Sequence, residues 1–164
     1  FQWGSATRTL IALAIALGVL LAIVYPMKRA LDDKDASKKL LGVFQKQLGR
    51  VFIIMPSSPV EERWFYLVSL NAGVSEEIIF RGFLLWYLTH YFSELWAAVL
   101  AVLLFSLAHL YQGIRNQPAL IGISAATVMM FVITESLLVP ILFHILLDVF
   151  QGRSVARLQR QQTS

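Results

Sequence analysis

Long runs without a charged residue constrain this chain more than any other feature of its sequence. No Asp, Glu, Lys or Arg occurs in residues 9–27, 95–114 or 116–134. At ~1.5 Å per residue, a helix of about 20 residues spans the ~30 Å hydrocarbon core of a bilayer. A water-soluble globule of 164 residues does not need several such runs. The pattern therefore indicates an integral membrane protein.

Composition supports this interpretation and excludes several other classes. Hydrophobic residues make up 57% of the chain, charged residues make up 15%, and the mean hydropathy is +0.66. These values exclude a disordered chain, a coiled coil and a nucleic-acid-binding arm. The absence of cysteine excludes a disulfide framework, a zinc ribbon and a cysteine nucleophile. In a membrane protein, the net charge of +4 indicates basic cytoplasmic loops and not a nucleic-acid partner.

We expect an all-α, polytopic transmembrane helical bundle of about five spans. The expected spans are residues 9–27, 64–88, 95–112, 118–134 and 136–150. We assign residues 1–63 to an N-terminal anchor and basic connector, 64–150 to the core, and 151–164 to a basic polar tail. Because the chain begins with Phe1 and not with Met, we also expect it to be a fragment or a processed chain.

The basic connector contains an amphipathic pattern. Apolar residues recur in it at helical spacing, namely Leu40, Leu41, Phe44, Leu48 and Val51. Lysines lie beside this stripe, which is typical of a helix that lies on the membrane surface. A solvated connector is the alternative interpretation.

The basic residues also set the expected orientation. Placing residues 28–63 in the cytoplasm also places the loop with Arg115 and the tail after residue 150 there. This puts 12 of the 14 Lys and Arg residues on that side, as the positive-inside rule favours. We therefore expect a protein of a prokaryotic plasma membrane, with its active site toward the cytoplasm. If the last span ends near residue 150, His144 lies roughly 9 Å from its inner end.

Six ionisable side chains interrupt the expected spans. Each costs at least ~2.5–3.5 kcal/mol inside a bilayer, so each is a candidate for function. Glu77 and Arg81 are four residues apart and can pair on one helix face, as can His144 and Asp148. Convergence in the bundle interior would spare all of them contact with lipid. The six are Glu76, Glu77, Arg81, His109, His144 and Asp148.

The converging set suits two hydrolytic chemistries. A zinc ion can use His, Glu and Asp as ligands and lower the pKa of a bound water. Alternatively, a glutamate acts directly on water as general base, with a histidine in support. Three further ionisable residues have structural interpretations: His90 at the outer interface, and Glu94 and Glu135 in solvated loops. H-E-x-x-H and G-x-S-x-G motifs are absent.

Three motifs resemble those of the CPBP family, which comprises CAAX prenyl endopeptidases, bacteriocin-processing enzymes and Abi-type intramembrane proteases. Residues 76–82, EEIIFRG, resemble its E-E-x-x-x-R motif. Residues 105–109, FSLAH, resemble F-x-x-x-H, and residues 144–148, HILLD, resemble H-x-x-x-N/D. Residues 134–137, TESL, resemble its T-G-S-L turn, with Glu135 in place of glycine. The third motif ends in Asp148, where many members have asparagine.

The resemblance implies an intramembrane endopeptidase that acts at the lipid bilayer on a peptide or protein substrate, which can itself be membrane-anchored. It implies Glu76, His109, His144 and Asp148 as catalytic residues, or as ligands of Zn²⁺ if a metal is used. It implies supporting roles for Glu77, Arg81 and Phe105. The alternatives are a non-catalytic scaffold of the same fold, a proton-coupled carrier, or a haem protein ligated by His109 and His144.

Overall fold

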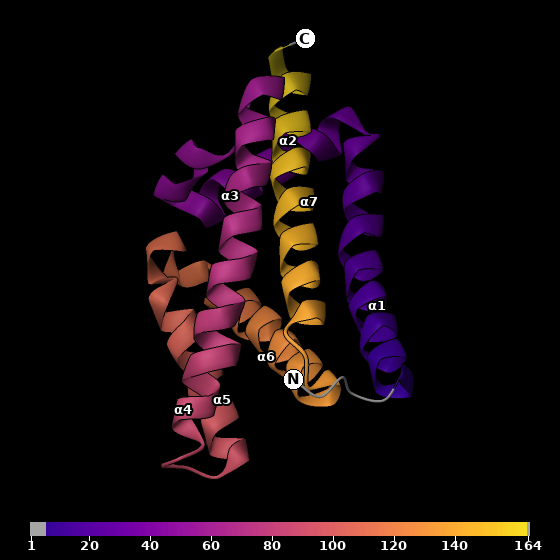
Figure 1. Ribbon diagram of the computed structural model, residues 1–164. Helices are drawn as coiled ribbons and strands as arrows, with labels where there is room; N and C mark the ends of the chain where they lie inside the picture. The colour runs from indigo at the N-terminus through magenta and orange to yellow at the C-terminus, as the bar shows by residue number, and fades with distance from the viewer. Residues whose placement is uncertain (1–5, 164) are drawn as a thin grey trace.

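A computed structural model describes residues 6–163, and every element within them is helical (Figure 1). This confirms the predicted all-α class. The elements of the N-terminal half are α1 (Ala6–Leu31), α2 (Lys34–Leu48), the 3₁₀ helix η1 (Gly49–Ile54), α3 (Pro59–Glu77), the π-helical η2 (Ile78–Leu84) and α4 (Leu85–Leu88). Those that follow are α5 (Glu94–Ala108), the 3₁₀ turns η3 (Leu110–Gln112) and η4 (Ile114–Asn116), α6 (Gln117–Thr134) and α7 (Leu138–Thr163).

Three of these helical segments are long and apolar enough to cross a membrane: Ala6–Arg29, Ile114–Thr134 and Leu138–Gln162. They correspond to the first, fourth and fifth expected spans. The expected third span is α5, which is apolar but only 15 residues long. The expected second span consists of α3, η2 and α4, which follow one another without a break. These segments carry the charged residues of the first motif. The bundle is therefore that of an integral membrane protein.

Short polar residues fix where the connector helices begin. The side chain of Asp33 accepts hydrogen bonds from two backbone N–H groups in the first turn of α2. Ser58 caps α3 by accepting from the backbone N–H of Glu61 at 3.3 Å, and Pro59 occupies the first helical position. Both arrangements satisfy N–H groups that have no partner within the helix itself.

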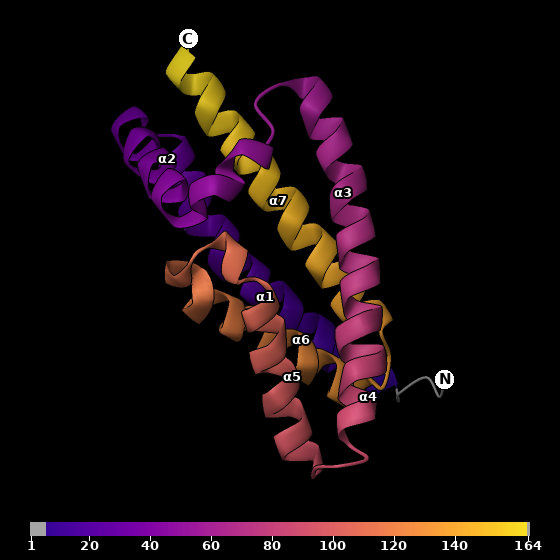
Figure 2. The ribbon, with the colours of Figure 1, turned by 90° about the vertical axis from the view of Figure 1, so that its left-hand side faces the viewer.

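Close approach of α3 and α7 depends on glycine at two of their contacts. A Cβ on Gly73 would lie 2.5 Å from the side chain of Ile145 and 3.2 Å from its backbone nitrogen. A Cβ on Gly152 would lie 2.3 Å from the Phe65 ring. Small residues let helices pack tightly where lipid offers no hydrophobic driving force. Figure 2 shows the two helices converging toward the α4 end of α3.

The remaining helices pack around this pair. α5 packs on α6, and α1 contacts both α6 and α7. Ala12 and Ala16 of α1 are buried against Met130 of α6 and Phe143 of α7. The outward faces stay apolar, as lipid contact requires, with exposed Leu67, Leu70, Ile79, Phe83, Leu103 and Leu107.

The two ends of the bundle differ in charge. The basic end holds residues 28–58 and the C-terminal part of α7, at the top of Figure 1. The turn end holds the connections 89–93 and 135–137 and the start of α1. At the turn end, Arg8 Nη1 lies 3.0 Å from Glu135 Oε1. The segments expected in the cytoplasm therefore lie together at one end.

The expected amphipathic helix is present as α2, but its apolar stripe has a different partner. Leu41, Phe44 and Leu48 are buried against Val155 and Leu158 of α7, whereas we expected the stripe to contact the membrane surface. The expected basic polar tail, residues 151–164, continues α7 through residue 163, and its apolar residues Val155, Ala156 and Leu158 are buried. The side chains of Lys34 and Arg50 lie outside the described residues.

Substitution of Gly73 should test whether close packing of α3 on α7 sets the geometry of the bundle. Gly73→Ala forces Ile145 or its backbone to move, so we expect destabilisation of about 1–3 kcal/mol, typical of overpacking. Gly122→Ala in α6 is the matched control, because nothing lies within 4 Å of the added Cβ. Thermal unfolding in detergent measures both. Equal melting temperatures for the two variants would contradict the packing argument.

Candidate functional site

The first motif lies where α3 ends and η2 begins. Glu76 and Glu77 are the last two residues of α3, so their side chains leave the helix about 100° apart. The side chain of Glu77 is completely buried, whereas 26% of the Glu76 side chain is exposed. π-helical segments such as η2 are rare and often occur at functional sites. The two carboxylates therefore have different surroundings and different partners.

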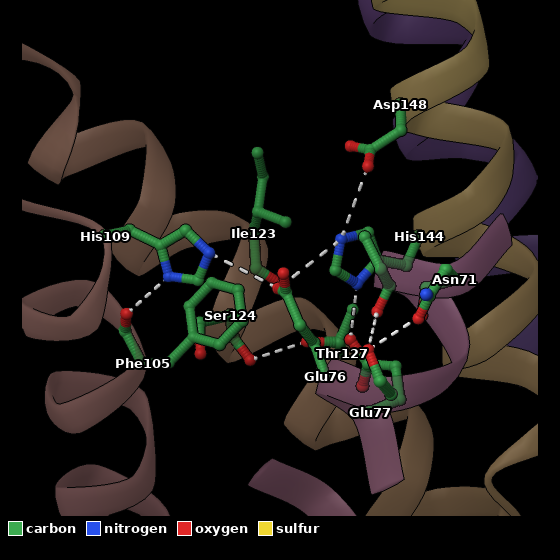
Figure 3. Close-up of polar contacts among 12 residues, drawn as sticks. Asn71, Glu76, Glu77, Phe105, His109, Ile123, Ser124, Thr127, His144 and Asp148 are labelled. Carbon is green, nitrogen blue, oxygen red and sulfur yellow. Dashed lines mark hydrogen bonds and ion pairs between the residues drawn. The ribbon is translucent and has the colours of Figure 1, made fainter. Parts of the chain in front are cut away.

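Glu77 holds both Arg81 and His144 through one oxygen. Arg81 Nη1 donates to Glu77 Oε1 at 3.1 Å, as the i,i+4 spacing predicts. His144 Nδ1 lies 2.8 Å from the same oxygen. A carboxylate paired with arginine accepts hydrogen bonds and does not donate them, so Nδ1 of His144 carries the proton. Nε2 of His144 consequently points away, toward Glu76 and Asp148 (Figure 3).

His109 is oriented in the same way from the end of α5. Its Nδ1 donates to the backbone carbonyl of Phe105 at 2.8 Å, which leaves Nε2 facing Glu76 Oε2 at 3.3 Å. The Phe105 ring stacks on the His109 ring, with centroids 4.3 Å apart. The guanidinium carbon of Arg81 lies 4.5 Å from the centroid of the same Phe105 ring. Phe105 thus fills the space between the arginine and the imidazole.

Glu76 lies between the two imidazoles, as Figure 3 shows. Its Oε2 is 3.3 Å from His109 Nε2 and 3.9 Å from His144 Nε2. This oxygen is buried and has no hydrogen-bond partner in the described part of the chain. A buried carboxylate oxygen without a donor is costly, so the position calls for a water molecule, a proton or a cation.

Asp148 lies near the site but does not hold His144 in place. Its Oδ2 is 3.8 Å from His144 Nε2, which is too long for a hydrogen bond. The residue that fixes the orientation of His144 is Glu77, through Nδ1. Asp148 can therefore act only from the Nε2 side of the imidazole, beside the water or as a metal ligand.

Two further residues of the site are absent from the sequence expectations. Arg81 Nη2 donates to Ser124 Oγ at 3.0 Å, to the Ser124 carbonyl at 3.3 Å and to Thr127 Oγ1. Arg81, Ser124 and Thr127 are all buried. Two hydroxyl residues three positions apart in an apolar span were the available signal, since such residues often hydrogen-bond across membrane helices. They join η2 to α6.

The site opens into a cavity of about 180 Å³ that extends toward the basic end. Leu48, Val51, Ile54 and Met55, from the end of α2, η1 and the residue that follows, line one wall of this cavity. Polar groups also line it, namely Tyr111, Gln112 and Gln151. The cavity is large enough for several waters and for part of a peptide.

The depth of His144 needs correction, because α7 does not end near residue 150. His144 lies six residues after Leu138, roughly 9 Å from the turn-end start of α7, and α7 continues to Thr163. The connection of the site to the basic end comes instead from the η1 and η3 segments around the cavity.

The other ionisable residues lie apart from this site. His90 is exposed near the turn end, and its Nδ1 contacts the Trp86 carbonyl. Glu94 is the first residue of α5 and not part of a loop. Glu135 is not merely solvated, because it pairs with Arg8 and adopts a left-handed φ of 53°. This conformation favours glycine, the residue of the resembled turn.

Metal and haem binding place different demands on this geometry. The His, Glu and Asp donors are of the kind that binds zinc, but no three such side chains among residues 6–163 lie in an arrangement that would hold a metal ion. A haem would need His109 and His144 on opposite faces of a porphyrin. Instead, both Nε2 atoms converge on Glu76.

Replacement of Arg81 tests whether the buried network is structural. Arg81→Met strands the Glu77 carboxylate, so we expect a loss of ~3–5 kcal/mol in stability together with a loss of activity. The double variant Arg81→Met, Glu77→Gln removes both charges and should recover much of that stability, as thermal unfolding can measure. An unchanged melting temperature for Arg81→Met would contradict the role of this network.

Comparison with known proteins identifies a family. A family model described as type II CAAX prenyl endopeptidase Rce1-like matches residues 61–150. No curated protein and no solved structure matches the chain. The matched range covers more than half of the 164 residues and contains all three motifs of the site. The chain therefore belongs to the family of Rce1-like type II CAAX prenyl endopeptidases.

Proposed function

We propose that this protein is an intramembrane endopeptidase that cleaves membrane-associated peptides with a water molecule activated by Glu76. Membership of the Rce1-like family supports protease activity. The observation that carries the mechanism is the buried Glu76 Oε2, which lacks a hydrogen-bond partner among the described residues and faces two imidazole nitrogens. A water molecule there would have acceptors for both of its hydrogens.

In the proposed mechanism, Glu76 and His109 hold the water. One hydrogen of the water bonds to Glu76 Oε2 and the other to His109 Nε2, because Nδ1 of His109 is engaged by the Phe105 carbonyl. An oxygen lone pair then remains free to attack the scissile carbonyl carbon. Glu76 takes the proton as the C–O bond forms, which is general base catalysis.

The remaining proton transfer completes the reaction. The proton on Glu76 passes to the amide nitrogen as the C–N bond breaks, and a carboxylic acid and an amine leave. His144, when protonated at Nε2, donates to the negatively charged oxygen of the tetrahedral intermediate. Glu77 is a positioning residue, since it holds His144 through Nδ1.

A bound metal is the alternative way to activate the water. Glu76, His109, His144 and Asp148 are the residues whose side chains could close around it, and a metal would act as a Lewis acid on that water. The donor chemistry and the convergence of both Nε2 atoms on Glu76 support this alternative. Metal dependence should therefore be measured together with the role of Glu76 as general base.

A conservative change at Glu76 tests the proposed base. Glu76→Gln keeps the shape of the side chain but removes its ability to take a proton, so cleavage of a prenylated CAAX peptide should fall about a hundredfold or more. Glu94→Gln is the matched control, because Glu94 is exposed and lies at the turn end. Both variants should unfold like the wild type.

Three results would alter this proposal. Near-wild-type cleavage by Glu76→Gln would remove Glu76 from the mechanism. Loss of activity on chelation, restored by zinc, would establish the metal alternative. A well-folded wild-type protein that cleaves no peptide in a broad library would favour the non-catalytic scaffold.

We also propose that the basic end faces the cytoplasm and that substrate reaches the site from that side. The distribution of Lys and Arg and the η1 wall of the cavity support this orientation. The chain has no cysteine, so a single introduced cysteine is the only position that a thiol reagent can label. Lys39→Cys should resist a membrane-impermeant thiol reagent in intact cells, whereas Ser93→Cys at the turn end should react. The opposite pattern would reverse the orientation.

A further inference from the structure

A second cavity lies between α1 and α7 at the basic end. It measures about 280 Å³ and shares no lining residue with the cavity of the candidate active site. Its wall combines the basic residues Lys28, Arg153 and Arg157 with the apolar residues Val24, Leu31 and Phe150. At about 30 Å³ per water molecule, the volume is several times what a single ordered water needs.

Positive charge predominates at this cavity. Lys28, Arg153 and Arg157 are all exposed, and they come from two helices that are distant in sequence. Arg157 Nη2 lies 3.8 Å from Asp32 Oδ1, a pair in which both side chains are more than half exposed. Such a pair is weak, so Arg157 can exchange Asp32 for another anion at little cost. Ser154 adds a hydroxyl to the same wall.

The cavity also lies at the right depth for a lipid headgroup. Lys28 follows the start of α1 by 22 residues, or about 33 Å, close to the ~30 Å thickness of a hydrocarbon core. Arg153 and Arg157 follow the start of α7 by roughly 22 and 28 Å. Lys28 and Arg157 therefore lie close to one membrane interface, and Arg153 lies about one helical turn deeper than Arg157. On each helix, the apolar residue Val24 or Phe150 precedes the basic residues on the hydrocarbon side.

We propose that this cavity binds the phosphate group of an anionic phospholipid, with Lys28, Arg153 and Arg157 around the phosphate and the acyl chains along Val24 and Phe150. Basic pockets between membrane helices on the cytoplasmic side suit anionic headgroups. A zwitterionic lipid carries its own ammonium group, which these residues repel. This proposal does not depend on the proposed catalytic mechanism.

Lipid titration of the full chain in detergent provides the test. Native mass spectrometry with dioleoyl phosphatidylglycerol should show a bound lipid, with affinity at least about tenfold above that for dioleoyl phosphatidylcholine. The triple variant Lys28→Gln, Arg153→Gln, Arg157→Gln should lose about tenfold in affinity for phosphatidylglycerol. Lys38→Gln, Lys39→Gln, Lys46→Gln is the matched control, since it removes equal charge from α2, away from this cavity.

The outcomes separate a lipid site from diffuse charge attraction and from a simple anion site. Equal losses in the triple variant and its control would indicate diffuse attraction and overturn the proposal. Displacement of the lipid by millimolar inorganic phosphate, without preference for phosphatidylglycerol, would indicate a simple anion site and also overturn it. If the triple variant unfolds, Lys28→Gln alone, compared with Lys38→Gln, repeats the test at one exposed side chain.

Discussion

The buried Oε1 atom of Glu77 is the point on which the geometry of the site depends. It accepts hydrogen bonds from Arg81 at 3.1 Å and from His144 at 2.8 Å. Since an unpaired buried charge is costly, these contacts fix η2 and α7 relative to each other. Arg81 extends the connection to α6 through Ser124 and Thr127. One carboxylate thus holds three helices in register and turns Nε2 of His144 toward Glu76.

Local spacing in the sequence identified the participants but not all of their partners. The i,i+4 pairing of Glu77 with Arg81 follows from helix geometry alone, and so does the shared face of His144 and Asp148. The contact between Glu77 and His144 joins residues 67 positions apart and exists because α3 and α7 approach closely at Gly73. From the sequence alone, Asp148 was the expected partner of His144, because it is the neighbour on the same helix. Partners within a helix are set by periodicity, whereas partners across helices are set by packing.

Packing between helices also explains why the basic end differs from what the sequence predicted. The amphipathic stripe of α2 was recognisable, but a stripe does not reveal whether lipid or another helix covers it. In the structure, Val155 and Leu158 of α7 cover Leu41 and Leu48. The arginines of residues 151–164 made this stretch resemble a polar tail, although its apolar residues recur three positions apart, as on one face of a helix. The packed end of α7 brings α2, and with it η1, over the cavity of the site.

Charge balance explains why both possible mechanisms use the same residues. Glu76, Glu77 and Asp148 contribute three carboxyl groups, and Arg81 supplies the fixed positive charge beside them. With both imidazoles neutral, ionised carboxylates would leave a net charge of about −2 in an apolar bundle, which is unfavourable. Compensation has to come from the Nε2 side, since Nδ1 of each imidazole is already engaged. A proton on an imidazole and a bound metal ion both place positive charge beside Glu76 Oε2. That is also where the attacking water and the negatively charged oxygen of the intermediate would lie, so the electrostatic demand of the resting site coincides with that of hydrolysis.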